Sequence, residues 1–184
     1  MFIIVSGIDQ AGKTTIAKKI SDNFNIPYLK FSGPGTLKTH DSLIWARDSI
    51  IFHVSILRLL EKLYEQHVEI AAVFDRFYPD EIVYSKIFRN LDLFEEYKEI
   101  DERFASIGTI LIYMEPPPID ILRERWKNET RVSIEKVDVL ANEFNKFMNY
   151  TKLSIFRMST DFSFDNFDKI RNLIKNLSIR IVKK

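Results

Sequence analysis

The chain has 184 residues, a length that favours one domain, and its 46% hydrophobic and 29% charged composition is ordinary for a globular protein. A formal net charge of +1 gives no reason to expect a nucleic-acid or membrane partner, and the absence of cysteine excludes disulfides and thiolate metal sites. The sequence shows neither a basic leader before an apolar run nor an apolar stretch of about 20 residues, so we expect a cytoplasmic protein.

A strand, a glycine-bounded loop and a helix are the first expected elements. Phe2 to Val5 is an apolar, β-branched run typical of a buried strand, and apolar residues recur at helical spacing after Thr14. Between them, the loop matches the phosphate-binding pattern G-x-x-x-x-G-K-[ST]. Lys13 would neutralise the β- and γ-phosphates of a nucleoside triphosphate, and the Thr14 hydroxyl would ligate Mg²⁺. The residues expected around the phosphates are Gly7, Gln10, Ala11, Gly12, Lys13, Thr14 and Thr15.

The rest of the chain alternates between apolar strands and amphipathic helices, which predicts an α/β fold with a parallel sheet covered on both faces. The expected strands are Tyr28 to Phe31, Glu69 to Asp75, Thr109 to Met114 and Leu153 to Met158. The expected helices are a long one from Asp41 or Ser42 through Leu63, with a break near Asp48 left open, then Pro79 to Arg89, Phe94 to Ile107, Ile119 to Lys127, one with its core face from Ile134 to Met148, and Phe164 to Leu177. His53 and His67 are expected on helix surfaces.

Two further stretches carry charges suited to phosphate chemistry. Asp75 closes the third strand, where a carboxylate would hold Mg²⁺ through water or accept a proton from the acceptor, and Arg76 would bind a phosphate as a planar fork. Arg123, Arg125 and Arg131 form a basic cluster, from which a mobile segment would bring an arginine to the transferring phosphoryl group. The alternatives are a structural ion pair at the strand end and a solvated basic face.

Together these stretches resemble the thymidylate kinases and, more loosely, the related nucleoside monophosphate and deoxynucleoside kinases. The resemblance rests on GIDQAGKTT at Gly7 to Thr15, the helix containing Ile50 to Phe52, FDRFYPDEIVYSK at Phe74 to Lys86, IYMEPPP at Ile112 to Pro118, and the arginine-bearing segment Arg123 to Arg131. It implies a P-loop kinase domain over residues 1–184, a three-layer αβα core with a five-stranded parallel sheet of order 2-3-1-4-5, and a short lid at about residues 123–133. It also implies ATP and Mg²⁺, and it suggests a homodimer packed through the long helices.

The resemblance also assigns roles to individual residues. Asp9 would meet the sugar hydroxyl of the acceptor, Lys30 its phosphate and Phe52 its base. Asp75 and Arg76 match the family's Asp-Arg pair. Arg123 would lie near the donor adenine, with Arg125 or Arg131 near the transferring phosphate. Each has an alternative, since Phe52 shares a helical stripe with core residues, Asp9 would also suit a local pair, and Lys30 would suit an exposed strand end.

Three departures from the family pattern bear on the acceptor. Ile56 stands where thymidylate kinases often carry an arginine on the acceptor side, and Arg58 is expected to face elsewhere. Gln10 replaces the P-loop arginine of one family branch, which leaves catalysis to a lid arginine. Lys30 replaces an arginine and so loses bidentate phosphate binding.

The sequence therefore predicts a kinase that transfers the ATP γ-phosphoryl group to a deoxynucleoside monophosphate, with thymidylate as the first choice. One alternative is a deoxynucleoside kinase, in which the acceptor is a free 5′-hydroxyl and Asp75 acts as the base. An alternative of another class is a P-loop regulatory NTPase that hydrolyses slowly and signals to a partner.

Overall fold

The computed structural model describes residues 1–31, 42–68, 70–127, 132–159 and 168–172. Its strands are β1 (Phe2–Gly7), β2 (Tyr28–Lys30), β3 (Ala72–Asp75), β4 (Ile110–Met114) and β5 (Ser154–Met158). Its helices are α1 (Lys13–Phe24), α2 (Ser42–Glu65), α3 (Tyr78–Arg89), α4 (Phe94–Ser106), α5 (Ile119–Trp126), the 3₁₀ helix η1 (Ile134–Lys136) and α6 (Val137–Tyr150). All strand pairs are parallel, in the order β2-β3-β1-β4-β5, which confirms the expected topology.

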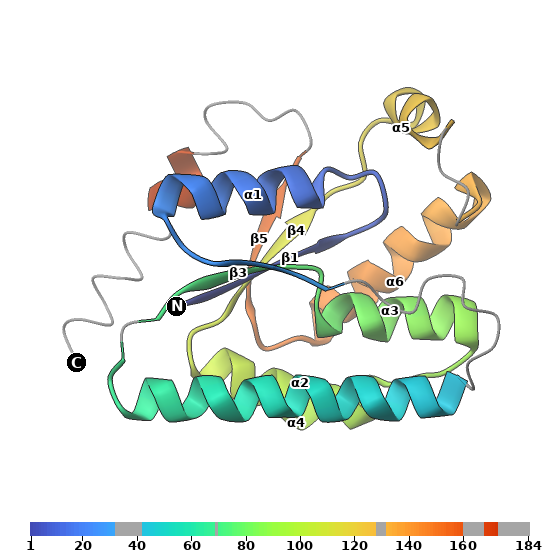
Figure 1. Ribbon diagram of the computed structural model, residues 1–184. Coiled ribbons are helices and arrows are strands. Elements are labelled where there is room, and N and C mark those ends of the chain that lie inside the picture. The colour runs from blue at the N-terminus through green and yellow to red at the C-terminus, as the bar shows by residue number, and fades with distance from the viewer. Residues whose placement is uncertain (32–41, 69, 128–131, 160–167, 173–184) are drawn as a thin grey trace.

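The helices cover both faces of the sheet. In Figure 1, α1 and a short helical turn at residues 168–172 lie on one face, whereas α2, α3, α4 and α6 lie on the other. The helix α5 lies beyond the carboxyl ends of the strands, on the side of the loop that joins β1 to α1 (Figure 1). The arrangement is therefore the three-layer αβα architecture expected from the sequence. Among the helices of the described residues, none combines the length and apolar character that crossing a bilayer requires.

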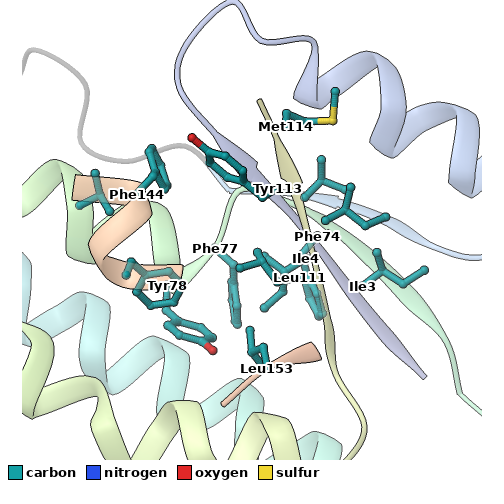
Figure 2. Packing of buried hydrophobic residues seen from close by; sticks show 14 of the residues in the cluster. Ile3, Ile4, Phe74, Phe77, Tyr78, Leu111, Tyr113, Met114, Phe144 and Leu153 are labelled. Carbon is teal, nitrogen blue, oxygen red and sulfur yellow. The ribbon is translucent and has the colours of Figure 1, made fainter. Parts of the chain in front are cut away.

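The core lies mainly between the sheet and the α3, α4 and α6 layer. Every residue of β1, β3 and β4 is buried, because these central strands have helices on both faces. Figure 2 shows Phe77, the N-cap of α3, packed toward Phe74 and Leu111 of the sheet, with Tyr78 on the side of Phe77 away from them. The Phe74 and Phe77 rings stack with centroids 4.8 Å apart. Since Phe77 and Tyr78 directly follow β3, this packing fixes where the residues at the end of that strand point.

Most boundaries agree with the sequence to within one or two residues, with three differences. The third strand begins at Ala72, which pairs with Phe2 near the start of β1, and Ile70 and Ala71 precede the strand. Glu69, where the strand was expected to begin, lies outside the described residues. The helix α2 runs unbroken through Asp48. His53 is buried, not on the surface: its Nδ1 lies 2.7 Å from the Tyr97 hydroxyl, and burial lowers its pKa to about 3. Of the last expected helix, only residues 168–172 are described.

Candidate active site at the phosphate loop

The loop between β1 and α1 has the backbone of a phosphate cradle. Gly7 adopts φ +141°, and a Cβ there would lie 2.5 Å from the carbonyl oxygen of Met114, so the close approach of β4 excludes any side chain. Gly12 is the N-cap of α1 in the left-handed conformation, at φ 86°. Gln10 also has a positive φ, at 61°. The chain therefore wraps around the amino end of α1, where backbone amides and the helix dipole favour an anion.

Lys13 is held inside this loop. Its Nζ donates hydrogen bonds to the carbonyl oxygens of Gly7, at 2.8 Å, and Ile8, at 2.5 Å, and the residue is only 4% exposed. Burial lowers the pKa of Lys13 to about 8. The ammonium group is thus hydrogen-bonded to carbonyl oxygens of the loop, where it could contact a phosphate that binds there. Ala11 is buried beneath the loop and Thr15 is exposed on α1.

Thr14, in the first turn of α1, contacts Asp75 at the end of β3. The Thr14 hydroxyl donates to Asp75 Oδ2 at 2.6 Å, and the Tyr28 hydroxyl donates to the same oxygen at 2.7 Å. Asp75 Oδ1 is buried and has no hydrogen-bond partner among the described residues. A hydroxyl and a carboxylate with one unused oxygen are hard oxygen ligands of the kind Mg²⁺ prefers, so the residues present fit this ion.

The donor set around this point is small. The described residues hold no cluster of three or more histidine, cysteine, aspartate or glutamate side chains that would bind a metal without other ligands. Mg²⁺ in nucleotide enzymes takes one or two protein ligands and completes its shell with phosphate oxygens and water. The Thr14–Asp75 pair matches that mode of binding.

Arg76 and Asp9 form a second pair beside the loop. Arg76 Nη2 donates to Asp9 Oδ1 at 2.5 Å, and Lys13 Nζ lies 3.9 Å from the same oxygen. Burial by itself would raise the pKa of Asp9, but the charges of Lys13 and Arg76 outweigh burial and hold this pKa below its usual value. Arg76 adopts a left-handed φ of 65°. This turn directs its side chain from the end of β3 back over the phosphate loop.

The lid arginines differ in their placement. Arg125 of α5 donates from Nη1 to the carbonyl oxygen of Gln10 at 3.1 Å, so this arginine reaches the phosphate loop. Arg123 points to solvent, with a 67% exposed side chain 3.9 Å from Asp120. Arg131 lies outside the described residues. Of the two predicted arginines that the structure describes, Arg125 reaches the loop and Arg123 does not.

Two of the predicted acceptor residues, Lys30 and Phe52, lie near the carboxyl end of β2. Lys30 is exposed and lies directly opposite Asp75 in the register of β2 and β3. Phe52 of α2 is 41% exposed, and its ring centroid lies 5.3 Å from that of Phe31. An accessible aromatic surface is thus available near the carboxyl end of β2. Ile56 is half-buried and Arg58 is exposed, so neither supplies a buried cation here.

Sequence reasoning did not single out Asp80, which lies in the first turn of α3. Its carboxylate is buried, accepts a hydrogen bond from the Ser6 hydroxyl at 2.6 Å, and faces Lys13 and Arg76. An aspartate in the first turn of a helix is normally explained by its favourable interaction with the helix dipole. This ordinary explanation gave no reason to predict another role for Asp80. The signal available in the sequence was its position only four residues after Arg76, at the start of the following helix.

Comparison with known proteins agrees with this geometry. No family model matches the chain. In sequence it is similar to the probable thymidylate kinase of Methanococcus aeolicus, with 25% identity over 197 residues that cover 100% of this chain and 94% of that protein. In structure it is similar to the YorR protein of Bacillus subtilis, solved in complex with phosphorylated GDP: the TM-score is 0.67, with 21% identity over 98% of both chains. It is also similar to the deoxyadenosine kinase of M. mycoides, with a TM-score of 0.55 and 19% identity over 96% of this chain and 100% of that one.

The sheet order, the phosphate loop and these structural neighbours show that the chain has the fold of the P-loop nucleotide kinases. Within that class, the full-length sequence likeness supports the thymidylate kinase-like family.

Proposed function

We propose that this protein transfers the γ-phosphoryl group of ATP to a deoxynucleoside monophosphate, with dTMP as the first choice of acceptor. The observation that carries the proposal is the Asp9–Arg76 pair, which lies between the phosphate loop and the acceptor side and offers both a carboxylate and a guanidinium group there. The full-length similarity to a probable thymidylate kinase supports the choice of dTMP. Residues 1–184 would act as one domain in the cytoplasm, with a lid at about residues 123–133.

In this proposal the protein works by positioning and charge stabilisation. Lys13 would exchange its two carbonyl partners for phosphate oxygens, and the amides around Gly7 to Thr15 would hold the remaining charge. Thr14 and Asp75 would hold Mg²⁺, which, when bound, supplies positive charge to the phosphate oxygens. Arg125, already at the loop through Gln10, would stabilise the transferring group. Arg131 keeps the same proposed role, and Arg123 would lie near the donor base.

On the acceptor side, Asp9 would accept a hydrogen bond from the sugar hydroxyl and Arg76 would bind the acceptor phosphate. Phe52 would pack against the base with its exposed face, and Lys30 would contribute charge from the end of β2. These four residues come from three different strand ends and from α2. Their convergence follows from the parallel sheet, in which the carboxyl ends of all strands lie along one edge.

A deoxynucleoside kinase is the second candidate. The observation that favours it is the half-buried Ile56, where an arginine for the acceptor phosphate would be expected, together with a solvent-exposed Arg58. In that case Asp75 would serve as the base for a free 5′-hydroxyl. A third candidate, from a different functional class, is a regulatory NTPase. That function would leave the contact of Arg125 with the loop without a role.

One assay separates these functions. The protein is incubated with ATP and Mg²⁺ and, in turn, each nucleoside and each deoxynucleoside monophosphate, including dGMP because a structural relative was solved with phosphorylated GDP. Release of ADP is followed, with the Lys13→Ala variant as the background. Phosphorylation of dTMP but not thymidine supports the proposal. Phosphorylation of thymidine without dTMP supports the second candidate, and acceptor-independent ATP hydrolysis supports the third.

A homodimer through α2 is part of the proposal. Large apolar side chains are exposed along this helix, namely Leu43, Ile44, Ile51 and Leu59. Light scattering after gel filtration tests this, with Ile51→Glu as the variant expected to give monomers and a monomeric wild type as the contrary result.

A further inference from the structure

Asp80 is a buried carboxylate that the proposed reaction does not use. It lies where the first turn of α3 packs against β1, and it is 6% exposed. The Ser6 hydroxyl donates to its Oδ2 at 2.6 Å, while its Oδ1 is buried with no hydrogen-bond partner among the described residues. An ionised carboxylate in this setting is costly unless cations compensate its charge.

The cations of the phosphate loop provide that compensation. Burial, the largest effect, raises the pKa of Asp80 to about 6, and the charges of Lys13 and Arg76 oppose the rise. In return, Asp80 raises the pKa of Lys13 more than Asp9 or Asp75 does. Asp80 is therefore the leading counter-charge of Lys13 in the unliganded loop.

Apart from Lys13, whose pKa burial lowers to about 8, the titratable groups around Asp80 do not exchange protons near neutral pH. Tyr84, on the same helix, has a pKa raised well above its ordinary value, first by burial and then by the charge of Asp9. Tyr113 of β4 also faces Asp80, and burial raises its pKa to about 12. Asp9 keeps a guanidinium partner at 2.5 Å, and its pKa is lowered. Among these described groups, only Asp80 and Lys13 have a pKa close to neutral pH, and of the two only the pKa of Asp80 lies below it.

Binding of a nucleoside triphosphate would change the charges around Asp80 in two ways. It brings several negative charges to the loop, and it draws Lys13 from the Gly7 and Ile8 carbonyls toward the phosphates. Both changes disfavour the ionised form of Asp80. Since its carboxylate cannot move to water from beneath β1 and α3, the available response is to take up a proton.

We infer that Asp80 is the buried counter-charge of the empty phosphate loop and that it takes up one proton from solvent when a nucleoside triphosphate draws Lys13 away. The inference rests on the proposed function, since it requires that this loop bind a triphosphate. Asp80 acts through Lys13 and touches neither nucleotide, so it is a positioning residue. Phosphate binding is thereby linked to pH.

Calorimetric titration with MgATP at pH 7, in two buffers of different ionisation enthalpy, measures the protons taken up on binding. We expect the wild type to take up at least about half a proton more than the Asp80→Asn variant. The amide still accepts the Ser6 hydrogen bond but cannot ionise, and protons exchanged by the ligand itself are common to both proteins. Asp22→Asn, on the exposed face of α1, is the matched control and should behave as the wild type.

The outcomes separate the inference from the function beneath it. If MgATP gives no binding heat with the wild type, the proposed function fails, and the inference fails with it. If MgATP binds with the same proton uptake in the wild type and Asp80→Asn, only the inference is overturned. The same holds if Asp9→Asn, and not Asp80→Asn, abolishes the uptake.

Two further measurements keep the test decisive if Asp80→Asn folds poorly. Ser6→Ala removes a hydrogen bond that favours the ionised carboxylate, so the pH of greatest proton uptake should move upward, and an unchanged profile overturns the inference. Where Asp80→Asn does fold, the ratio of the wild-type to the variant Kd for MgATP should grow by about tenfold between pH 6 and pH 8. A ratio that is independent of pH overturns the inference.

Discussion

The phosphate loop and the lid differ in how much of their chemistry the folded chain has already arranged. In the loop, Lys13 is held by two carbonyls, and Thr14 and Asp75 are joined directly. In the lid helix, Arg125 reaches the loop through one hydrogen bond to a backbone oxygen, and Arg123 faces solvent. The loop therefore resembles a preassembled site, whereas the proposed lid would add a charge to it. Dipoles and charges that are already fixed in the folded protein stabilise a transition state most strongly. We therefore expect the loop to contribute more than the proposed lid to lowering the activation free energy.

The largest expected effect is that of removing the loop cation. Lys13→Ala should lower kcat by at least about 10³-fold, because the β- and γ-phosphates lose their nearest positive charge in a buried site. Initial rates of ADP release with saturating ATP and acceptor measure this. Lys18→Ala, on the exposed face of α1, is the control. Substantial turnover by Lys13→Ala would remove the loop from the mechanism.

The lid provides the next effect. Arg125→Ala should lower kcat by about 10²-fold with a smaller change in the KM for ATP, because a charge near the transferring group acts mainly in the transition state. Arg123→Ala, on the same helix, should change the KM for ATP by a few-fold at most and leave kcat unaltered. Steady-state kinetics of both variants test the contrast. An equal loss of kcat in the two would contradict the different placement of their side chains.

Holding the charged groups of the loop in a buried site should lower the free energy of unfolding. The pH dependence caused by Asp80 measures part of this loss. The pKa of Asp80 lies at about 6 in the folded protein against the ordinary 3.8 of an aspartate, so the wild type should lose up to about 3 kcal/mol of folding stability as the pH rises from about 4 to about 6. The sign follows because the folded protein binds the proton more tightly than the unfolded chain. Above pH 6 the penalty is constant.

Asp80→Asn should lack this loss, and its free energy of unfolding should exceed that of the wild type by up to the same amount at pH 7. Urea unfolding at pH 4, 5, 6 and 7 measures both proteins, with Asp22→Asn as the control. A difference between Asp80→Asn and wild type that does not change with pH would show that Asp80 is not the titrating group.

The smallest effect is expected at the acceptor side. Phe52→Ala should raise the KM for the acceptor by about tenfold and leave the KM for ATP unchanged, because stacking of a base on an aromatic ring contributes roughly 1–3 kcal/mol. Lys62→Ala, at another exposed position of α2, is the control. If Phe52→Ala instead lowers thermal stability with no change in KM, its contact with Phe31 is structural only.

Much of the fold was predictable because the central strands are uninterrupted apolar runs and the helices between them are periodic. The start of β3 was not predictable, because Ile70 and Ala71 are as apolar as the strand itself. The strand starts at Ala72 because this residue pairs with Phe2, the first residue of β1. His53 was misplaced for a similar reason. A histidine on a helix suggests a polar surface, but here Phe77 and Tyr97 surround it with rings 4.5 and 5.6 Å away.

The site was predictable to the extent that a motif encodes local geometry. The phosphate loop forms within a few residues, so Lys13 and Thr14 were assigned from their spacing alone. Asp80 was not, because its significance arises from Ser6 and Lys13, which belong to distant parts of the chain. Arg125 was singled out from the sequence, but its contact with Gln10 was not predictable, because that contact depends on where the fold brings α5.

The central position of β1 has a consequence for the order in which the molecule forms. β1 pairs on one side with β3 and on the other with β4, and both partners are synthesised only after α1 and α2. Contacts of such large sequence separation form late in folding, because the intervening chain must first be brought together. The phosphate loop, although it lies near the start of the chain, should therefore mature among the last parts of the protein. Nucleotide would then bind only the completed fold, and cellular ATP would protect new molecules from unfolding as they are finished.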